Sequence, residues 1–171
     1  MSMTLDPQQK KQVLRTFTYG LYAVSCANEG EVNAFTANWL TQVSFEPPLI
    51  AVSIENNTKS LPMILRDRHF LVNVFRSSGE SEEAHKQDRN FAGSLGKSAL
   101  KYPDKLANIA YTPGPGGAPI LEDALAWVAC NVTHTMETGD STLVIGEVVE
   151  VGTQGSGEPL TMNEVGFKHA G

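Results

Sequence analysis

The stretch of residues 33–45 combines apolar side chains with an unusual number of neutral polar ones. Its polar members are Asn33, Thr36, Asn38, Thr41, Gln42 and Ser44. Buried polar groups cost about 1–3 kcal/mol each unless they are hydrogen-bonded. So many neutral donors and acceptors predict either a turn that satisfies its own Asn and Thr side chains or a site for a planar polar ligand.

A second polar cluster follows at the expected junction of a strand and a helix. It comprises Ser53, Asn56, Asn57, Thr58, Lys59 and Ser60. Backbone N–H groups at a helix start, hydroxyl groups and one lysine together suit a phosphate, although this composition is also common in loops and helix caps. Ser53 lies twelve positions after Thr41, and a double proline turns the chain between them. We therefore expect the two clusters to face one ligand, uncharged at one end and dianionic at the other.

Other kinds of site find no support in the sequence. The four histidines, His69, His85, His134 and His169, show no ligand-like spacing to one another or to a cysteine, so no metal site is expected. Cys26 and Cys130 lie far apart in apolar stretches and are expected to be reduced. No Gly-x-Ser-x-Gly motif, Walker loop or Gly-x-Gly-x-x-Gly after a strand occurs, which disfavours a hydrolase, a P-loop and a Rossmann site.

The elements that must position these clusters are mostly strands. Asp6-Pro7 starts a helix that we expect to run to about residue 16, and further helices are expected from residue 60 and over 81–91. The expected strands are residues 21–27, 31–37, 49–54, 70–75, 124–136 and 142–151. Hairpin-length turns between consecutive strands favour an antiparallel sheet closed into a barrel over a βαβ arrangement.

Length and composition bound the class of protein. A chain of 171 residues fits a single domain, taken here as 1–171, and its 41% hydrophobic and 19% charged residues are globular values. The net charge of −6 disfavours a nucleic-acid binder, which needs a basic face. There is no signal-peptide pattern and no apolar run near the ~20 residues of a membrane span. We expect a cytoplasmic protein with no membrane or nucleic-acid partner.

Four segments of the chain resemble the flavin reductase-like, FMN-binding split-barrel family. They are residues 22–25 (Tyr-Ala-Val-Ser), 33–48, 53–60 and 139–148 (Gly-Asp-Ser-Thr-Leu-Val-Ile-Gly-Glu-Val). The resemblance covers most of the chain, in order. It implies a mainly β fold with short flanking helices, namely a six-stranded antiparallel split β-barrel, and a homodimer with FMN at the subunit interface.

The resemblance also implies roles for individual residues. The residues that would line the isoalloxazine ring and ribityl chain are Thr36, Ala37, Asn38, Trp39, Leu40 and Thr41. Ser53, Asn56, Lys59 and Ser60 would hold the phosphate end, and Phe91 matches a position that often closes over the cofactor. FAD or riboflavin would be exchangeable alternatives to FMN, and NADH or NADPH would be the electron donor.

The chain departs from the family at one position near the turn Gly139-Asp140. The family often has a histidine where this chain has Ser141, and serine cannot become cationic. Asp140 and Ser141 are the catalytic candidates at this turn. In the tail, where relatives often have Tyr-x-Gly, His169 is a partial substitute.

Three hypotheses follow for the function. The first is an NAD(P)H-dependent flavin reductase that transfers hydride from nicotinamide to flavin, with a monooxygenase as a further partner. The second, motivated by Ser141, is an FMN-binding electron-transfer protein that a protein partner reduces without nicotinamide oxidation. The third is a non-enzymatic barrel that binds another small ligand or serves in assembly and has lost flavin.

Overall fold

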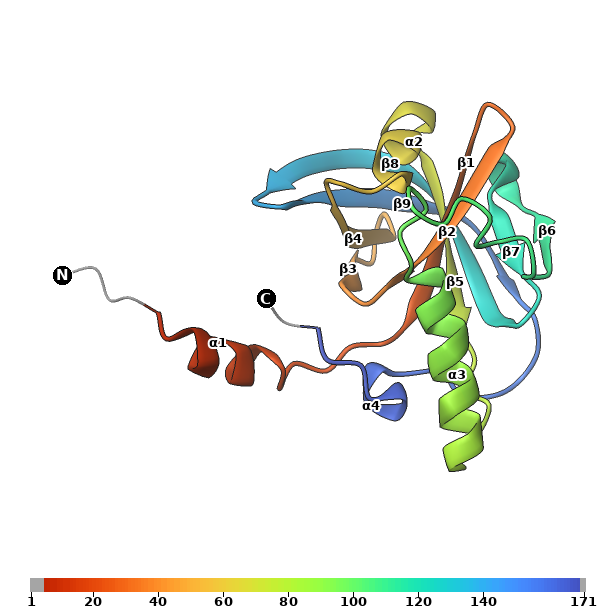
Figure 1. Cartoon of the computed structure of the whole chain (residues 1–171). Helices are drawn as coiled ribbons and strands as arrows, with labels where there is room; N and C mark the ends of the chain where they lie inside the picture. Colours follow the sequence, from red (N-terminus) through yellow and green to blue (C-terminus); the bar gives the residue numbers. More distant parts are fainter. Residues whose placement is uncertain (1–4, 170–171) are drawn as a thin grey trace.

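The computed structural model describes residues 5–169 and is built mainly of β-strands with short helices (Figure 1). The helices are α1 (Pro7–Leu14), α2 (Ser60–Asp67), α3 (Glu82–Leu95) and α4 (Met162–Val165), with a short 3-10 turn at Pro115–Gly117. The strands are β1 (Tyr22–Asn28), β2 (Glu31–Ala37), β3 (Leu40–Ser44), β4 (Leu49–Glu55), β5 (His69–Phe75), β6 (Tyr111–Pro113), β7 (Pro119–Leu121), β8 (Ala124–Thr138) and β9 (Ser141–Thr153). Over the described range, no helix is long and apolar enough to cross a membrane.

Seven strands form one antiparallel sheet in the order β2-β1-β5-β8-β9-β4-β3. β6 and β7 form a separate hairpin. The prediction of a mainly β, antiparallel fold is confirmed, but the count of six strands is wrong. The extra strand is β3, because residues 33–45 contain the end of β2 and then a second strand. Across residues 5–169 the hydrogen-bonded order is open, with β2 and β3 at its edges.

Two groups of apolar side chains fix the helices against the sheet. Leu61, Met63 and Ile64 of α2 pack against a cluster that includes Phe70 of β5 and Val144 of β9. Each fully buried side chain of this size contributes about 1.5–3 kcal/mol through the hydrophobic effect. The second group joins α3 and α4 to residues at the ends of β1 and β5. The start of α2 is therefore held rigidly over the sheet.

Helix α1 lies apart from the sheet. Asp6 caps it by accepting a hydrogen bond from Gln8 N at 3.0 Å, as the sequence predicts. None of its residues is buried; Val13 is exposed, and so is Phe17 just beyond the helix end. Figure 1 shows the helix reaching away from the body of the molecule.

Gly146 provides a test of the packing between β8, β9 and β5. A Cβ atom at this position would lie 2.5 Å from Phe70 Cε1 and 2.7 Å from Cys130 Cβ. We expect Gly146→Ala to lower the free energy of unfolding by about 1–3 kcal/mol, because a close-packed core does not accept the extra methyl group. Urea unfolding measures this change.

Gly93 in α3 is the matched control. A Cβ atom there would meet nothing closer than Phe167 Cζ at 3.8 Å. Since alanine is a better helix former than glycine by about 0.5–1 kcal/mol, Gly93→Ala should leave the protein equally or more stable. Equal stability of both variants would contradict the packing described for Gly146.

Candidate functional site

A cleft of about 450 Å³ opens between the end of β2, the start of α2 and the segment that follows α3. Its lining includes seven residues that the sequence assigned to one ligand: Thr36, Ala37, Asn38, Trp39, Ser53, Lys59 and Ser60. The two polar clusters therefore meet in one cleft. The arrangement required by the sequence argument, neutral groups at one end and a lysine at the other, is present in the fold.

The pairing of β3 with β4 brings the two clusters together. Leu40 lies opposite Val52, and Thr41 lies opposite Ala51. One step further, Ser53 N donates a hydrogen bond to Trp39 O at 3.0 Å. Residues that are distant along the chain thus become neighbours across a strand pair.

The neutral end of the cleft contains a polar group without a partner. The side-chain nitrogen of Asn38, Nδ2, is buried and has no hydrogen-bond partner within residues 5–169. An unpaired buried amide costs about 1–3 kcal/mol, a cost that an acceptor on a ligand would remove. Thr36 differs, because its hydroxyl already donates to Ala92 O of α3.

Trp39 presents a flat surface beside Asn38. The imidazole of His169 stacks on the Trp39 ring, with centroids 4.9 Å apart and planes within 2° of parallel. His169 Nδ1 also lies 3.3 Å from Asn38 Oδ1. The C-terminal segment therefore reaches the neutral end of the cleft, which makes His169 part of the site.

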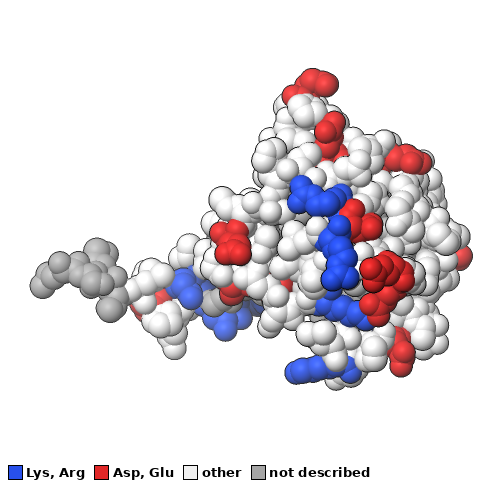
Figure 2. All heavy atoms as spheres, turned by 90° about the horizontal axis from the view of Figure 1, so that it is seen from above, with Lys and Arg blue, Asp and Glu red and all other residues white. Residues whose placement is uncertain are grey.

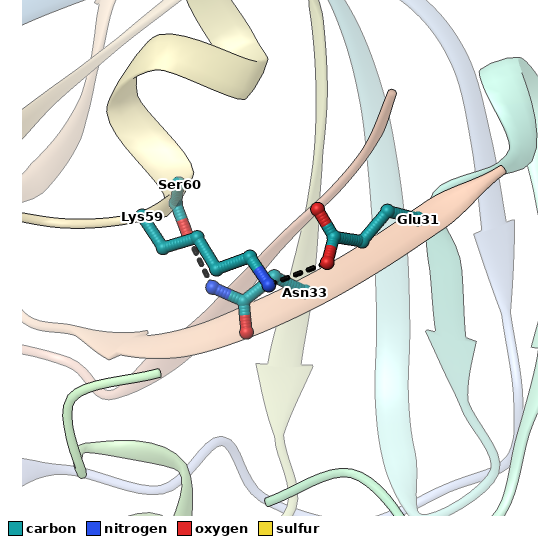
Figure 3. Close-up of polar contacts among 4 residues, drawn as sticks. All are labelled: Glu31, Asn33, Lys59 and Ser60. Atoms are coloured by element: carbon teal, nitrogen blue, oxygen red, sulfur yellow. Dashed lines mark hydrogen bonds and ion pairs between the residues drawn. The ribbon is translucent and has the colours of Figure 1, made fainter. Parts of the chain in front are cut away.

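The opposite end of the cleft is built on the first residues of α2. Asn33 Nδ2 donates a hydrogen bond to Ser60 Oγ at 2.7 Å, and both side chains are buried. Lys59 Nζ lies 2.6 Å from Glu31 Oε1 (Figure 3). Both contacts join the start of α2 to β2. This end of the cleft carries the Ser60 hydroxyl, the Lys59 ammonium and the positive end of the helix, although Pro62 supplies no N–H to the first turn.

Three further lysines line the cleft from the segment after α3: Lys97, Lys101 and Lys105. Lys105 Nζ donates hydrogen bonds to Leu95 O at 2.8 Å and Lys97 O at 2.9 Å. Burial lowers the pKa of Lys105 to about 8, because the ammonium is partly removed from water. Nearby, burial raises the pKa of Cys26 to about 11, so this thiol stays protonated at neutral pH.

Sequence reasoning missed these three lysines. They lie in a loop-rich region without a predicted element, but their spacing of four residues is a signal that a charge scan of the loop would detect. Their side chains add positive charge to a protein whose net charge is −6. The cleft therefore suits an anionic ligand despite the acidic composition.

Four expected cofactor residues do not line the cleft. Leu40 packs against the core below it, and the exposed Thr41 lies on the edge strand β3. Asn56 bonds to the β8–β9 turn, accepting from Thr142 Oγ1 at 2.7 Å. Phe91 packs edge-to-face on Phe75, with ring centroids 5.6 Å apart.

The two catalytic candidates also lie outside the cleft of their own chain. Asp140 is exposed in the β8–β9 turn, and Ser141 is buried with its hydroxyl donating to Asp140 Oδ1 at 3.0 Å. Ser141 pairs across the strands with Glu55, which does line the cleft. The turn is thus next to the site, separated from it by the end of β4.

Comparison with known proteins matches this geometry to a family. The family model described as "Flavin reductase like domain" matches residues 14–171. The chain belongs to the flavin reductase-like family. Curated relatives are named flavin reductases, so the resemblance noted in the sequence and the predicted class of oxidoreductase, a flavin reductase, are confirmed.

Three relatives illustrate the match. The NADH-dependent flavin reductase StyB of Pseudomonas fluorescens is 29% identical over 160 residues, 93% of this chain and 86% of StyB. HsaB, the reductase subunit of a flavin-dependent monooxygenase of Mycobacterium tuberculosis, is 28% identical over 86% of this chain and 73% of HsaB. The solved structure of flavin reductase PheA2 in its native state has a TM-score of 0.71 and 29% identity, covering 92% of this chain and 93% of PheA2.

The lowered pKa of Lys105 predicts a pH dependence of flavin binding. The ammonium charge is present below about pH 8 and is lost as the pH rises through that value. Between pH 7 and 9 the affinity for FMN should therefore fall by about two- to five-fold, the value of one partly exposed charge pair, whereas riboflavin affinity should hold. Fluorescence titration measures both, and Lys105→Met should flatten the FMN curve. The same FMN curve in the variant would show that Lys105 does not face the ligand.

Proposed function

We propose that this chain binds FMN in the cleft and catalyses the reduction of flavin by NADH or NADPH. One observation carries the proposal. The buried Nδ2 of Asn38, which has no partner in the part of the chain that the structure describes, shares a single cleft with Lys59 and Ser60 at the start of α2. A ligand that is planar and polar at one end and anionic at the other satisfies both.

The residues at the neutral end fit an isoalloxazine ring. Asn38 Nδ2 would donate to a ring carbonyl or ring nitrogen, which removes the cost of leaving the amide unpaired. Trp39 is an aromatic side chain of the cleft wall that can stack on a flat ring, as its stacking with the His169 imidazole illustrates. Ser53 lies beside Trp39 because of the hydrogen bond between their main chains.

The residues at the α2 end fit the phosphate of FMN. Ser60 and the Lys59 ammonium at the start of α2 would attract an anion, and Lys97, Lys101 and Lys105 also line the cleft. FMN has about thirty heavy atoms, so at ~0.3 kcal/mol per atom its binding free energy is roughly −9 kcal/mol, which is sub-micromolar. We prefer FMN to FAD because the cleft has one end suited to a phosphate, at the start of α2.

When bound, the flavin would accept a hydride from the nicotinamide of NADH or NADPH. The chain's own task is then to bind, to orient and to exclude water, because hydride transfer needs no side-chain nucleophile. The cleft accordingly contains flat and neutral groups at one end rather than an acid–base pair. The catalytic roles of Asp140 and Ser141 stay predictions.

One observation favours a second function, that of an FMN-binding electron-transfer protein reduced by a protein partner. Ser141 is buried and bonded to Asp140, so neither a cation nor a free donor faces the cleft from this turn. Transfer from a protein donor would not require a nicotinamide contact there.

Assembly completes the proposal. The chain is taken as one flavin reductase-like domain, 1–171, that forms a homodimer in the split-barrel arrangement of the family. Exposed aromatic side chains support the dimer, because Phe45 is 90% exposed and Phe17 is 58% exposed. A monooxygenase that receives reduced flavin is proposed as a further partner, since HsaB is the reductase subunit of such an enzyme.

Turnover with nicotinamide tests the proposed function against its alternative. Purified protein with added FMN should oxidise NADH or NADPH in the steady state, and the visible absorbance of the bound flavin should bleach when oxygen is removed. Asn38→Leu, which removes the unpaired amide at similar volume, should weaken both FMN and riboflavin binding.

The opposite results separate the hypotheses. Retained flavin absorbance with no oxidation of either donor would leave the electron-transfer protein. No binding of any flavin would leave a small-ligand barrel. Unchanged flavin affinity in Asn38→Leu would remove the amide from the ring-binding set.

A further inference from the structure

The ion pair between Lys59 and Glu31 lies on the wall between two cavities. Lys59 lines both the flavin cleft and a second cavity of about 350 Å³, which we call the side cavity. Glu31 lines only the side cavity, together with Glu29 and Arg66. The contact of 2.6 Å therefore holds the Lys59 ammonium on Glu31, a residue of the side-cavity wall (Figure 3).

The partners come from elements held at a fixed distance. Glu31 is the first residue of β2, directly after the β1–β2 turn, and Lys59 is the cap residue of α2. The buried hydrogen bond from Asn33 to Ser60 ties the same two elements together one step further in. Since β2 and α2 are fixed by this bond, only the two side chains have to move when the pair opens.

Opening is feasible because the pair is partly in water. The Lys59 side chain is 25% exposed and the Glu31 side chain is 59% exposed. Ion pairs of this kind are worth about 0.2–1 kcal/mol, so a phosphate dianion at the start of α2 can compete for the lysine. If the ammonium instead stays on Glu31, the phosphate loses its cationic partner. Both outcomes lower the affinity for a phosphorylated flavin.

We propose that Glu31 lowers the affinity for a phosphorylated flavin because it competes with the flavin phosphate for the Lys59 ammonium. This inference rests on the proposed function, because it takes the α2 end of the cleft as the phosphate end. Glu31 weakens FMN and FAD but not riboflavin, which has no phosphate. The consequence is a reductase that discriminates weakly among flavins and releases a phosphorylated one readily.

The test compares Glu31→Gln with the wild-type full-length protein in FMN and riboflavin titrations at low salt. Glu31→Gln should bind FMN about two- to five-fold more tightly, the value of one partly exposed ion pair, and riboflavin with unchanged affinity. In a Lys59→Met background the same change should have less than about half that effect on a logarithmic scale, because there is no Lys59 ammonium for Glu31 and the phosphate to compete for.

Glu29→Gln is the matched control. Glu29 lies two residues before Glu31, in the β1–β2 turn, carries the same charge and pairs with Arg66 at 3.8 Å rather than with Lys59. It should leave FMN affinity unchanged, which separates the pairing with Lys59 from the general loss of a negative charge. The control is needed because charges of both signs lie close together on the surface: Figure 2 shows Lys and Arg interspersed with Asp and Glu on one face of the molecule.

Each contrary outcome identifies what failed. Unchanged FMN affinity in Glu31→Gln, with a loss in Lys59→Met, overturns the competition and leaves the phosphate site standing. If Glu29→Gln raises FMN affinity equally, or if Glu31→Gln keeps its full effect in the Lys59→Met background, the cause is the general loss of a negative charge. Either result also overturns the competition for Lys59. If both the wild type and Lys59→Met bind FMN no more tightly than riboflavin, the proposed phosphate end itself is overturned.

Discussion

The candidate site depends on one constraint, the antiparallel pairing of β3 with β4 beside the start of α2. The hydrogen bond from Ser53 N to Trp39 O continues that pairing past the end of β3. It sets the neutral residues at the end of β2 beside the chain that leads into the helix. Without this strand pairing the two ends of the cleft would separate, because along the chain they are joined only through the segment that contains the double proline.

Packing then fixes what the pairing brings together. Helix α2 is held by Leu61, Met63 and Ile64, and its first residue is bonded to Asn33 of β2. The polar groups of the site thus stand on rigid elements, which keeps their positions set before a ligand arrives and lowers the ordering cost of binding. Charged groups are arranged around this frame with more freedom, and the pairing of Lys59 with Glu31 uses that freedom.

Several features could be predicted from residues alone, and each has a local cause. The helix start at Asp6-Pro7 follows from capping, and strand β2 was placed with its observed bounds because a turn signal precedes it. The gathering of Thr36 to Trp39 with Lys59 and Ser60 was expected from polar groups in apolar surroundings. Strand β3 was missed, since its exposed edge position gives Thr41, Gln42 and Val43 no alternating burial to read.

The sequence by itself therefore determined the class of fold and the two polar clusters, and it predicted the chemistry of a ligand that they would share, because residue type and local spacing carry that information. Only the tertiary structure decided which polar groups are free. It turned Asn56 toward the β8–β9 hairpin, left Asn38 Nδ2 without a partner among residues 5–169, added Lys105 from a loop and paired Lys59 with Glu31. Those outcomes depend on contacts between residues distant along the chain, which spacing does not encode.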